Sequence, residues 1–233
     1  MADRNIANKT PMENFYNACF KQGALAIPLF NKIEGGVFNI TGQYISQGLA
    51  RAIGELLVPE DCEDAPLGID FRSLKLREIN LDDNGLKDEQ FAIILEALNK
   101  QKFLNKVSYV NNEIGPKSVK QLQTLIGDDG ESEVHDLRLT AIKCTKKLLY
   151  ELLEAISTAS KRLIKLRISS IDINDIVLMT KMNETIYALP QLVELNLSAL
   201  KMNGGKLADL MANITDTCTN LSILNISYNV LPT

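Results

Sequence analysis

Apolar and polar residues follow one pattern twice between Leu76 and Ile114. The two copies are Leu76-x-x-Ile79-x-Leu81-x-x-Asn84-x-Leu86 and Leu104-x-x-Val107-x-Tyr109-x-x-Asn112-x-Ile114. The alternating apolar positions in the centre of each copy predict a short strand with one buried face, because successive side chains of a strand point to opposite faces. The residues between the copies have the apolar spacing and the length of a helix. Each unit is thus predicted to contain a strand, a loop and a helix.

The same template recurs along most of the chain. It starts at Gly35, Leu76, Leu104, Val134, Leu163, Leu192 and Leu221, and from Leu76 onward the starts are 28 to 30 residues apart. A unit of this kind can bury its apolar face only against its neighbours. We therefore predict an α/β solenoid (a horseshoe) with a parallel sheet on its concave side and helices on its convex side.

The chain is predicted to have an N-terminal segment that precedes the repeats, and a repeat domain that contains an insertion. Residues 1–34 are predicted to form a disordered start and a helical cap: Thr10-Pro11-Met12-Glu13 has the features of a helix start, and we expect a second short helix from Pro28 to Ile33. Residues 35–233 are predicted to form the repeat domain of about seven repeats, with an insertion at 58–75 and an incomplete last repeat.

The loop after each strand carries a further signal. An asparagine in this loop can hydrogen-bond backbone groups that the turn leaves unpaired. The position is held by Asn84, Asn112 and Asn229 in three units, by Gln43 in the first, and by Ile142, Ile171 and Leu200 in the others. We expect the three aliphatic loops to satisfy their backbone groups in another way.

Composition narrows the function classes. The chain is 45% hydrophobic and 23% charged with a formal net charge of −4, so it lacks the basic balance of a nucleic-acid-binding protein. We find neither a secretory signal nor the roughly 20 apolar residues of a membrane span, and we expect a cytoplasmic protein without a membrane partner. The four cysteines form no CxxC pair and the one histidine is His135, which predicts reduced thiols, no metal and no cofactor.

No catalytic motif is found in the sequence. Neither a nucleophile motif nor a phosphate-binding loop accompanies His135, which we interpret as structural. The sequence therefore predicts a protein that is not an enzyme.

A basic centre is expected on the concave face. It consists of Lys106, Arg138, Lys165 and Arg167. These residues predict a groove for an acidic segment of another protein, since arginine can bind a carboxylate through two hydrogen bonds. The alternative is an ordinary solvated sheet face, whose charges are partly cancelled by Glu78, Asp136 and Glu194. The face has no aromatic anchors, which lowers the affinity that we expect.

The end of the repeat array is a second candidate binding site. Only Pro232 and Thr233 follow the last template match. A solenoid that ended there would expose a strand edge and apolar core residues. We expect Leu224, Ile226 and Leu231 to be covered, either by further chain, which is the favoured alternative, or by a partner.

The repeats resemble a known superfamily. With a period of about 29 residues and a helix in each unit, residues 35–231 resemble the ribonuclease-inhibitor-like leucine-rich repeat proteins. The segment Tyr16-x-x-Cys19-x-x-x-Gly23, followed by Pro28, resembles the N-terminal segment of leucine-rich repeat proteins of cilia and centrosomes. This resemblance implies a non-catalytic scaffold that binds other proteins in a large multi-subunit assembly of the cytoskeleton, such as the ciliary axoneme.

A GTPase-activating regulator is the alternative function, because Ran GTPase-activating proteins share this repeat type. Such proteins act through polar loop residues that follow the early strands. Here Asp82-Asp83-Asn84 is the polar cluster at a comparable place, and the acidic tail that usually follows the repeats is not seen.

Overall fold

The repeats stack into one continuous sheet with a layer of helices. The structure, a computed structural model, describes residues 11–28, 33–57, 76–127, 132–159, 162–202 and 204–230. The strands are β1 (Ile33–Glu34), β2 (Val37–Asn39), β3 (Glu78–Asn80), β4 (Lys106–Val110), β5 (Asp136–Thr140), β6 (Lys165–Ser169), β7 (Glu194–Asn196) and β8 (Ile223–Asn225). The helices are α1 (Pro11–Lys21), α2 (Gln47–Leu57), α3 (Asp88–Leu98), α4 (Pro116–Ile126), α5 (Lys146–Ser157), α6 (Ile176–Tyr187) and α7 (Gly204–Thr217).

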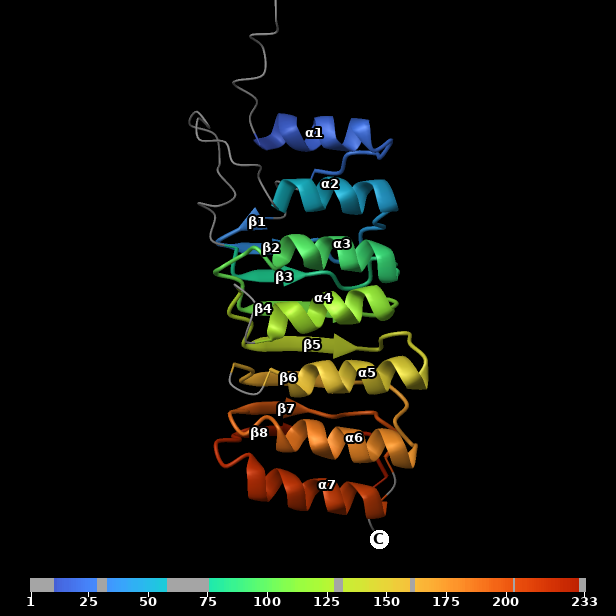
Figure 1. Cartoon of the computed structure of the whole chain (residues 1–233), viewed down its shortest axis with the longest axis vertical. Helices are drawn as coiled ribbons and strands as arrows, with labels where there is room; N and C mark the ends of the chain where they lie inside the picture. Colours follow the sequence, from blue (N-terminus) through green and yellow to red (C-terminus); the bar gives the residue numbers. More distant parts are fainter. Residues whose placement is uncertain are drawn as a thin grey trace, which may run out of the picture.

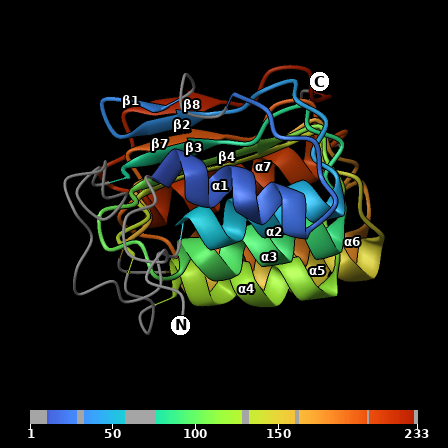
Figure 2. The same cartoon turned by 90° about the horizontal axis from the view of Figure 1, so that it is seen from above.

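The strands lie in the sheet in chain order, from β1 to β8 (Figure 1). Each pair from β2–β3 to β7–β8 is parallel, and equivalent template positions face each other, as Ile79, Val107 and Leu137 do. Helices α2 to α7 cover one face of the sheet and leave the other face bare of described helices (Figure 2). We call this second face the open face. The prediction of an α/β repeat solenoid with a parallel sheet is confirmed.

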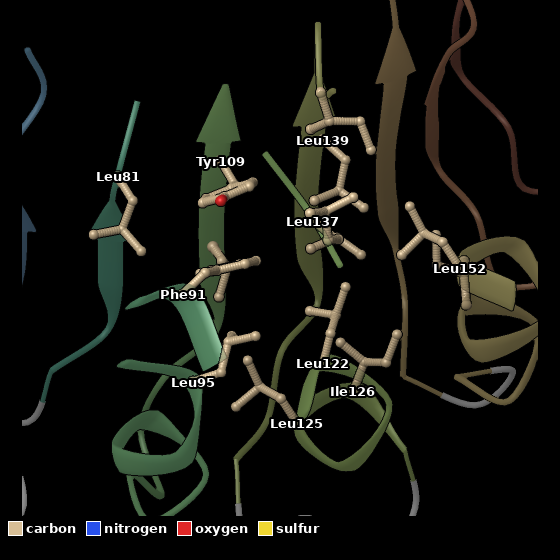
Figure 3. Close-up of a cluster of buried hydrophobic side chains, with 14 of the residues drawn as sticks. Leu81, Phe91, Leu95, Tyr109, Leu122, Leu125, Ile126, Leu137, Leu139 and Leu152 are labelled. Atoms are coloured by element: carbon tan, nitrogen blue, oxygen red, sulfur yellow. The ribbon is translucent and has the colours of Figure 1, made fainter. Parts of the chain in front are cut away.

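The core fills the space between the sheet and the helices (Figure 3). Template residues such as Leu81 and Leu137 are fully buried beneath helix residues such as Leu95 and Leu122. The Tyr109 ring stacks on Phe91 with 3.6 Å between ring centroids. Its hydroxyl donates a hydrogen bond to the Glu113 carbonyl at 2.5 Å, so the buried polar group of this side chain is satisfied.

The loop asparagines pair backbone groups, as predicted. The Asn112 side chain donates to the carbonyl of Leu81 at 2.7 Å and accepts from the amide of Leu86 at 2.9 Å. Asn229 likewise accepts from the amides of Leu200 and Met202 in the preceding loop. Each asparagine therefore serves the loop one repeat earlier.

Backbone pairing takes over where the asparagine is replaced by an aliphatic residue. The Ile114 amide donates to the Lys143 carbonyl at 3.1 Å, and the Lys143 amide donates to the Asn112 carbonyl at 2.8 Å. Glu113 and Lys143 thereby form a parallel bridge that extends the sheet into the loops. Further along, the Ile173 amide donates to the Leu200 carbonyl at 3.2 Å. In these loops, the backbone amides and carbonyls that no asparagine pairs thus form hydrogen bonds with the backbone of the neighbouring repeat.

At the N-terminal end, α1 packs against α2 and ends at a left-handed Gly23 with φ of 60°. Of the predicted second helix from Pro28 to Ile33, only the two ends are described: Pro28 is not helical, and Ile33 lies in β1, which pairs antiparallel with β2. Residues 29–32 lie outside the described residues. Gly35 and Gly36, with φ of 59° and 83°, adopt the turn that makes this hairpin possible.

Several expectations lie outside the described residues, namely the disordered start at 1–9, the insertion at 58–75 and Leu231. None of the helices in the described ranges combines the length and the apolar character needed to cross a membrane.

Candidate functional site

The open face carries a row of charges whose sign alternates from strand to strand. The sheet register aligns the side chains at the first position of each strand, which are Val37, Glu78, Lys106, Asp136, Lys165, Glu194 and Ile223. Within this row, Lys106 Nζ lies 2.6 Å from a carboxylate oxygen of Glu78. Lys165 Nζ lies 3.8 Å from Glu194. Cross-strand pairs of opposite charge stabilise a sheet, so the row supports its own register.

A second row, two residues further along each strand, contains both arginines. Arg167 is held on two sides: its Nη1 lies 2.6 Å from Asp136 and its Nε lies 2.8 Å from Glu194. Arg138 makes a longer contact, with Nη1 3.7 Å from an oxygen of Asp82. Asp82 in turn accepts a hydrogen bond from the Ser108 hydroxyl at 2.8 Å.

The four predicted cations are therefore all paired, in three groups: Lys106 with Glu78, Arg138 with Asp82, and Lys165 and Arg167 with Glu194 and Asp136. The predicted basic centre is electrically balanced at neutral pH. The sequence predicted that Glu78, Asp136 and Glu194 partly cancel the basic charges, but it did not predict the same role for Asp82. Asp82 could be placed on the open face because it follows Asn80 by two residues, whereas its contact with Arg138 is seen only in the structure.

The cations differ in how firmly they are held. The Arg167 side chain is 22% exposed, whereas those of Arg138 and Lys165 are 43% and 45% exposed. Arg138 and Lys165 also make long contacts with their carboxylates, at 3.7 and 3.8 Å. The two cations are exposed, whereas the carboxylates of Asp82 and Glu194 are only 11% and 17% exposed. Lys165 can turn to another carboxylate because Glu194 keeps its contact with Arg167, and Arg138 leaves Asp82 with the hydrogen bond from Ser108.

Burial changes the acid–base behaviour of the network. Burial raises the pKa of Asp82 and of Asp136, and the nearby cations only partly offset this effect. Burial by itself lowers the pKa of Arg167, but the hydrogen bonds and charges of Glu194 and Asp136 outweigh it and the pKa rises. Arg167 therefore stays protonated as the fixed centre of the face.

The polar cluster Asp82-Asp83-Asn84 is largely occupied in structural contacts. Asp82 is paired as described above, and the buried Asn84 side chain donates to the carbonyls of Ile40 and Gln43. Asp83 is exposed and accepts a hydrogen bond from Asn111 at 2.9 Å. Only Asp83 thus presents a carboxylate to solvent from this cluster.

His135 and the described cysteines have structural surroundings. The His135 Nδ1 atom lies 2.8 Å from the Arg162 carbonyl, a geometry in which the ring nitrogen donates. Burial raises the pKa of the thiols of Cys19, Cys144 and Cys218, so these remain protonated at neutral pH. Cys62 lies outside the described residues.

At the β8 end of the sheet, Leu224 and Ile226 are only partly buried. The equivalent residues of the preceding repeat, Leu195 and Leu197, are completely buried. Leu224 and Ile226 are thus more exposed than their equivalents one repeat earlier, and the expectation that they are covered stays a prediction.

The helical side has a groove that sequence reasoning missed. It lies between α5 and α6, has a volume of about 550 Å³ and is lined by Tyr150, Val177 and Leu178. An ion pair between Lys146 and Asp175, at 3.1 Å, lies beside it. The signal in the sequence was the apolar pair Ile176-Val177 at a helix start, where both side chains are exposed.

Comparison with known proteins identifies the fold and no closer relationship. No family model matches the chain, and no curated protein matches it. Among solved structures, the chain is similar to the tropomodulin C-terminal domain of Caenorhabditis elegans, with 16% sequence identity and a TM-score of 0.50. The likeness covers 73% of this chain and 92% of the tropomodulin domain. Together with the repeat pattern and the parallel register, it shows that the chain folds as a leucine-rich repeat solenoid.

Proposed function

We propose that this chain is a non-catalytic module that binds other proteins and acts as a scaffold in a cytoskeletal assembly. The observation that carries the proposal is the open face, where a balanced charge network leaves Arg138 and Lys165 exposed and loosely paired. A rigid sheet with lysine and arginine side chains that can change partners is suited to binding a polypeptide. We propose no catalytic role for these side chains.

The ligand that fits this face is an acidic segment of a partner protein. Arg138 can donate two hydrogen bonds to a partner carboxylate when its long contact with Asp82 opens. Lys165 can also bind a partner carboxylate, as a single positive charge. It can leave Glu194 for this contact because Arg167 still neutralises the Glu194 carboxylate. The face has few large apolar side chains, so we expect moderate affinity that gains from several contacts within an assembly.

A cytoskeletal setting, and more narrowly a ciliary axoneme, is proposed from the N-terminal segment. Of the residues that carry this resemblance, Cys19 is buried where α1 packs on the first repeat, and Gly23 ends α1 in a left-handed conformation. The packing of α1 on α2 supports the proposal that this segment caps the repeats of a module with a fixed surface.

The test follows a tagged full-length chain in ciliated cells. We expect the protein to localise to the cytoskeleton and to be retained after detergent extraction. The double variant Arg138→Glu/Lys165→Glu should lose most of this retention, because it places like charges opposite an acidic segment. The matched control is Lys120→Glu/Lys147→Glu, which makes the same change in net charge at exposed helix positions.

An even cytosolic signal, or equal loss of retention in both double variants, would overturn the proposal. The GTPase-activating alternative is tested with purified protein. If the wild-type chain stimulates GTP hydrolysis by Ran and the Asp83→Ala variant does not, the GTPase-activating function replaces the scaffold proposal.

A further inference from the structure

Helix α6 begins with two apolar residues that are exposed to solvent. Ile176 and Val177 are its first two residues, and they are 66% and 57% exposed. The second residue of each of the three preceding helices is exposed and charged: Glu89 in α3, Lys117 in α4 and Lys147 in α5. The repeat therefore does not require an apolar side chain at this position. Apolar side chains that gather on a surface, unlike single ones, mark a site of interaction.

The exposed pair borders the groove between α5 and α6, which are neighbours on the helical side (Figure 1). Val177 lines this groove together with Tyr150 and Leu178. A second hollow, of about 210 Å³, is lined by Ile176, Val177 and Tyr150, so the two hollows meet at Val177 and Tyr150. The half-buried Tyr150 ring lies with its centroid 5.1 Å from the Lys181 ammonium, which fixes it in place. A fixed tyrosine beside apolar side chains is a frequent anchor of protein–protein contacts.

The charges are balanced where the two helices begin. Lys146, the first residue of α5, pairs with Asp175 at 3.1 Å. Lys147 lies 3.8 Å from Glu151 of the same helix. Two ammonium groups thus meet two carboxylates, and this end of the groove has no net charge.

The charges are not balanced two turns further along. Glu154 of α5 and Glu184 of α6 both contact the Lys181 ammonium, at 3.7 and 3.3 Å. Both carboxylates are more than half exposed, whereas the Lys181 side chain is only 10% exposed. One ammonium between two carboxylates leaves one negative charge in excess. This end of the groove therefore favours a cation of the ligand.

The walls of the groove determine which backbone conformation fits it. Both walls are helices, whose backbone groups are hydrogen-bonded within each helix. An extended segment would need backbone partners that such a groove does not offer, whereas a helix satisfies its own backbone groups. An amphipathic helix that lays its apolar face in a hydrophobic groove is also an established mode of peptide recognition.

We propose that the groove between α5 and α6 binds a basic, amphipathic helix of a partner protein. Two apolar side chains of this helix fill the hollows at Tyr150 and Val177. A lysine or arginine one turn later faces Glu154 and Glu184. Tyr150 and Glu154 are about 6 Å apart along α5, which is the spacing of side chains one turn apart on the partner helix. A cation is favoured in the last turn of a helix, so the partner helix runs in the same direction as α5.

The groove and the open face lie on opposite sides of the molecule (Figure 2). Their proposed ligands have opposite charge, because the open face presents cations and the groove has an excess carboxylate. The binding of one ligand is therefore measured separately from that of the other.

Binding of a synthetic peptide to the purified full chain tests the proposal. The probe is an end-capped, fluorescently labelled, alanine-based peptide of about 18 residues, which is long enough to be helical. It carries two leucines and then an arginine on one face. We expect saturable binding in fluorescence anisotropy, with a Kd between about 1 and about 100 µM for a small interface. A peptide with serine in place of both leucines should bind at least about tenfold more weakly. Absence of binding, or equal binding of the two peptides, would overturn the proposal.

A substitution in α6 tests whether the peptide occupies this groove. Val177→Lys gives α6 the residue type that α4 and α5 have at this position, so we expect the variant to fold. It removes apolar surface and adds a positive charge, and should raise the Kd of the probe about tenfold or more. Thr124→Lys is the matched control, because it also replaces an exposed β-branched residue by lysine, on α4. The proposal fails if both variants bind the probe with equal affinity.

A reciprocal exchange of charge tests the position of the cation. Glu154→Lys should weaken binding of the probe about fivefold, and so should glutamate in place of the arginine of the peptide. The two changes together should restore most of the affinity, because they form an ion pair of reversed direction. Lack of recovery would contradict the proposal. Self-association of the chain in sedimentation that Val177→Lys abolishes would make a second copy the occupant and would overturn it as well.

Discussion

Asp88 of α3 caps the following helix through Ser118. Its Oδ1 atom accepts from the Ser118 amide at 2.7 Å and from the Ser118 hydroxyl at 2.8 Å, while Oδ2 accepts from the Lys117 amide at 3.2 Å. Gly115 makes room for this contact, because a Cβ atom there would lie 2.3 Å from the Asp88 Cγ atom. A side chain of one repeat thus performs the N-terminal capping of the next.

We expect Asp88→Ala to lower the free energy of unfolding by about 1 kcal/mol, the usual cost of losing an N-terminal cap. Urea denaturation followed by circular dichroism measures this change. Glu89→Ala is the matched control, because Glu89 makes only an exposed ion pair with Lys117 at 3.7 Å and should change stability by less than about 0.5 kcal/mol. Equal effects of the two substitutions would show that the cap contributes nothing.

The loop residue after each strand has a left-handed backbone, and in one repeat this residue is Ala141, with φ of 51°. A non-glycine residue in this conformation costs about 1–2 kcal/mol, which Ala141→Gly removes at an entropic cost of about 0.5–1 kcal/mol. We therefore expect this variant to be as stable as the wild type or slightly more stable. Ala208→Gly, at an exposed position of α7, should instead lose about 1 kcal/mol. Thermal unfolding compares the two, and an equal loss in both would contradict the left-handed geometry.

Asp82 should make stability depend on pH in a defined direction. Burial raises the pKa of its carboxyl in the folded state above the unfolded value. Its contribution to stability is thus fully present below the unfolded pKa of about 3.9 and is lost as pH rises through the folded pKa. Asp82→Asn should be more stable than the wild type at pH 7, and this advantage should shrink in acid.

Denaturation in urea at neutral and acidic pH measures the Asp82 effect. Asp83→Asn is the control, because the Asp83 carboxylate is exposed and accepts from Asn111. An advantage of Asp82→Asn that grows as the pH falls would contradict the assigned sign.

Tyr109 should not ionise while the protein is folded. Burial, together with the charges of Asp88 and Glu113, raises the pKa of its phenol far above the ordinary value. The stability that depends on the protonated phenol is therefore fully present below the unfolded pKa of about 10 and is lost at higher pH. In an ultraviolet titration, the ionisation of Tyr109 should coincide with alkaline unfolding.

Two variants test the burial of the Tyr109 phenol. In Tyr109→Phe, the step that coincides with unfolding should be smaller by one tyrosine. Loss of the hydrogen bond to the Glu113 carbonyl should also lower stability by about 1 kcal/mol. Tyr228→Phe, which changes an 88% exposed ring, is the control for stability and should change it by less than about 0.5 kcal/mol. Full ionisation of Tyr109 before unfolding would contradict its burial.

The sequence by itself determined the repeat unit, its strands and most of its helices. The reason is that these depend on short-range periodicity: residues such as Ile79 and Leu81 must share one strand face whatever the neighbouring repeat contains. The open-face cations could be found in the same way, because their positions follow from alternation along each strand.

Only the tertiary structure decided how these residues are paired. Arg138 meets Asp82 across the intervening strand β4, and Asp88 meets Ser118 in the next repeat, so both contacts depend on register and side-chain reach between repeats. The antiparallel β1 depends likewise on an edge that only the folded sheet provides. Local pattern is a property of one repeat, whereas charge balance, capping and edge closure are properties of neighbouring repeats in contact.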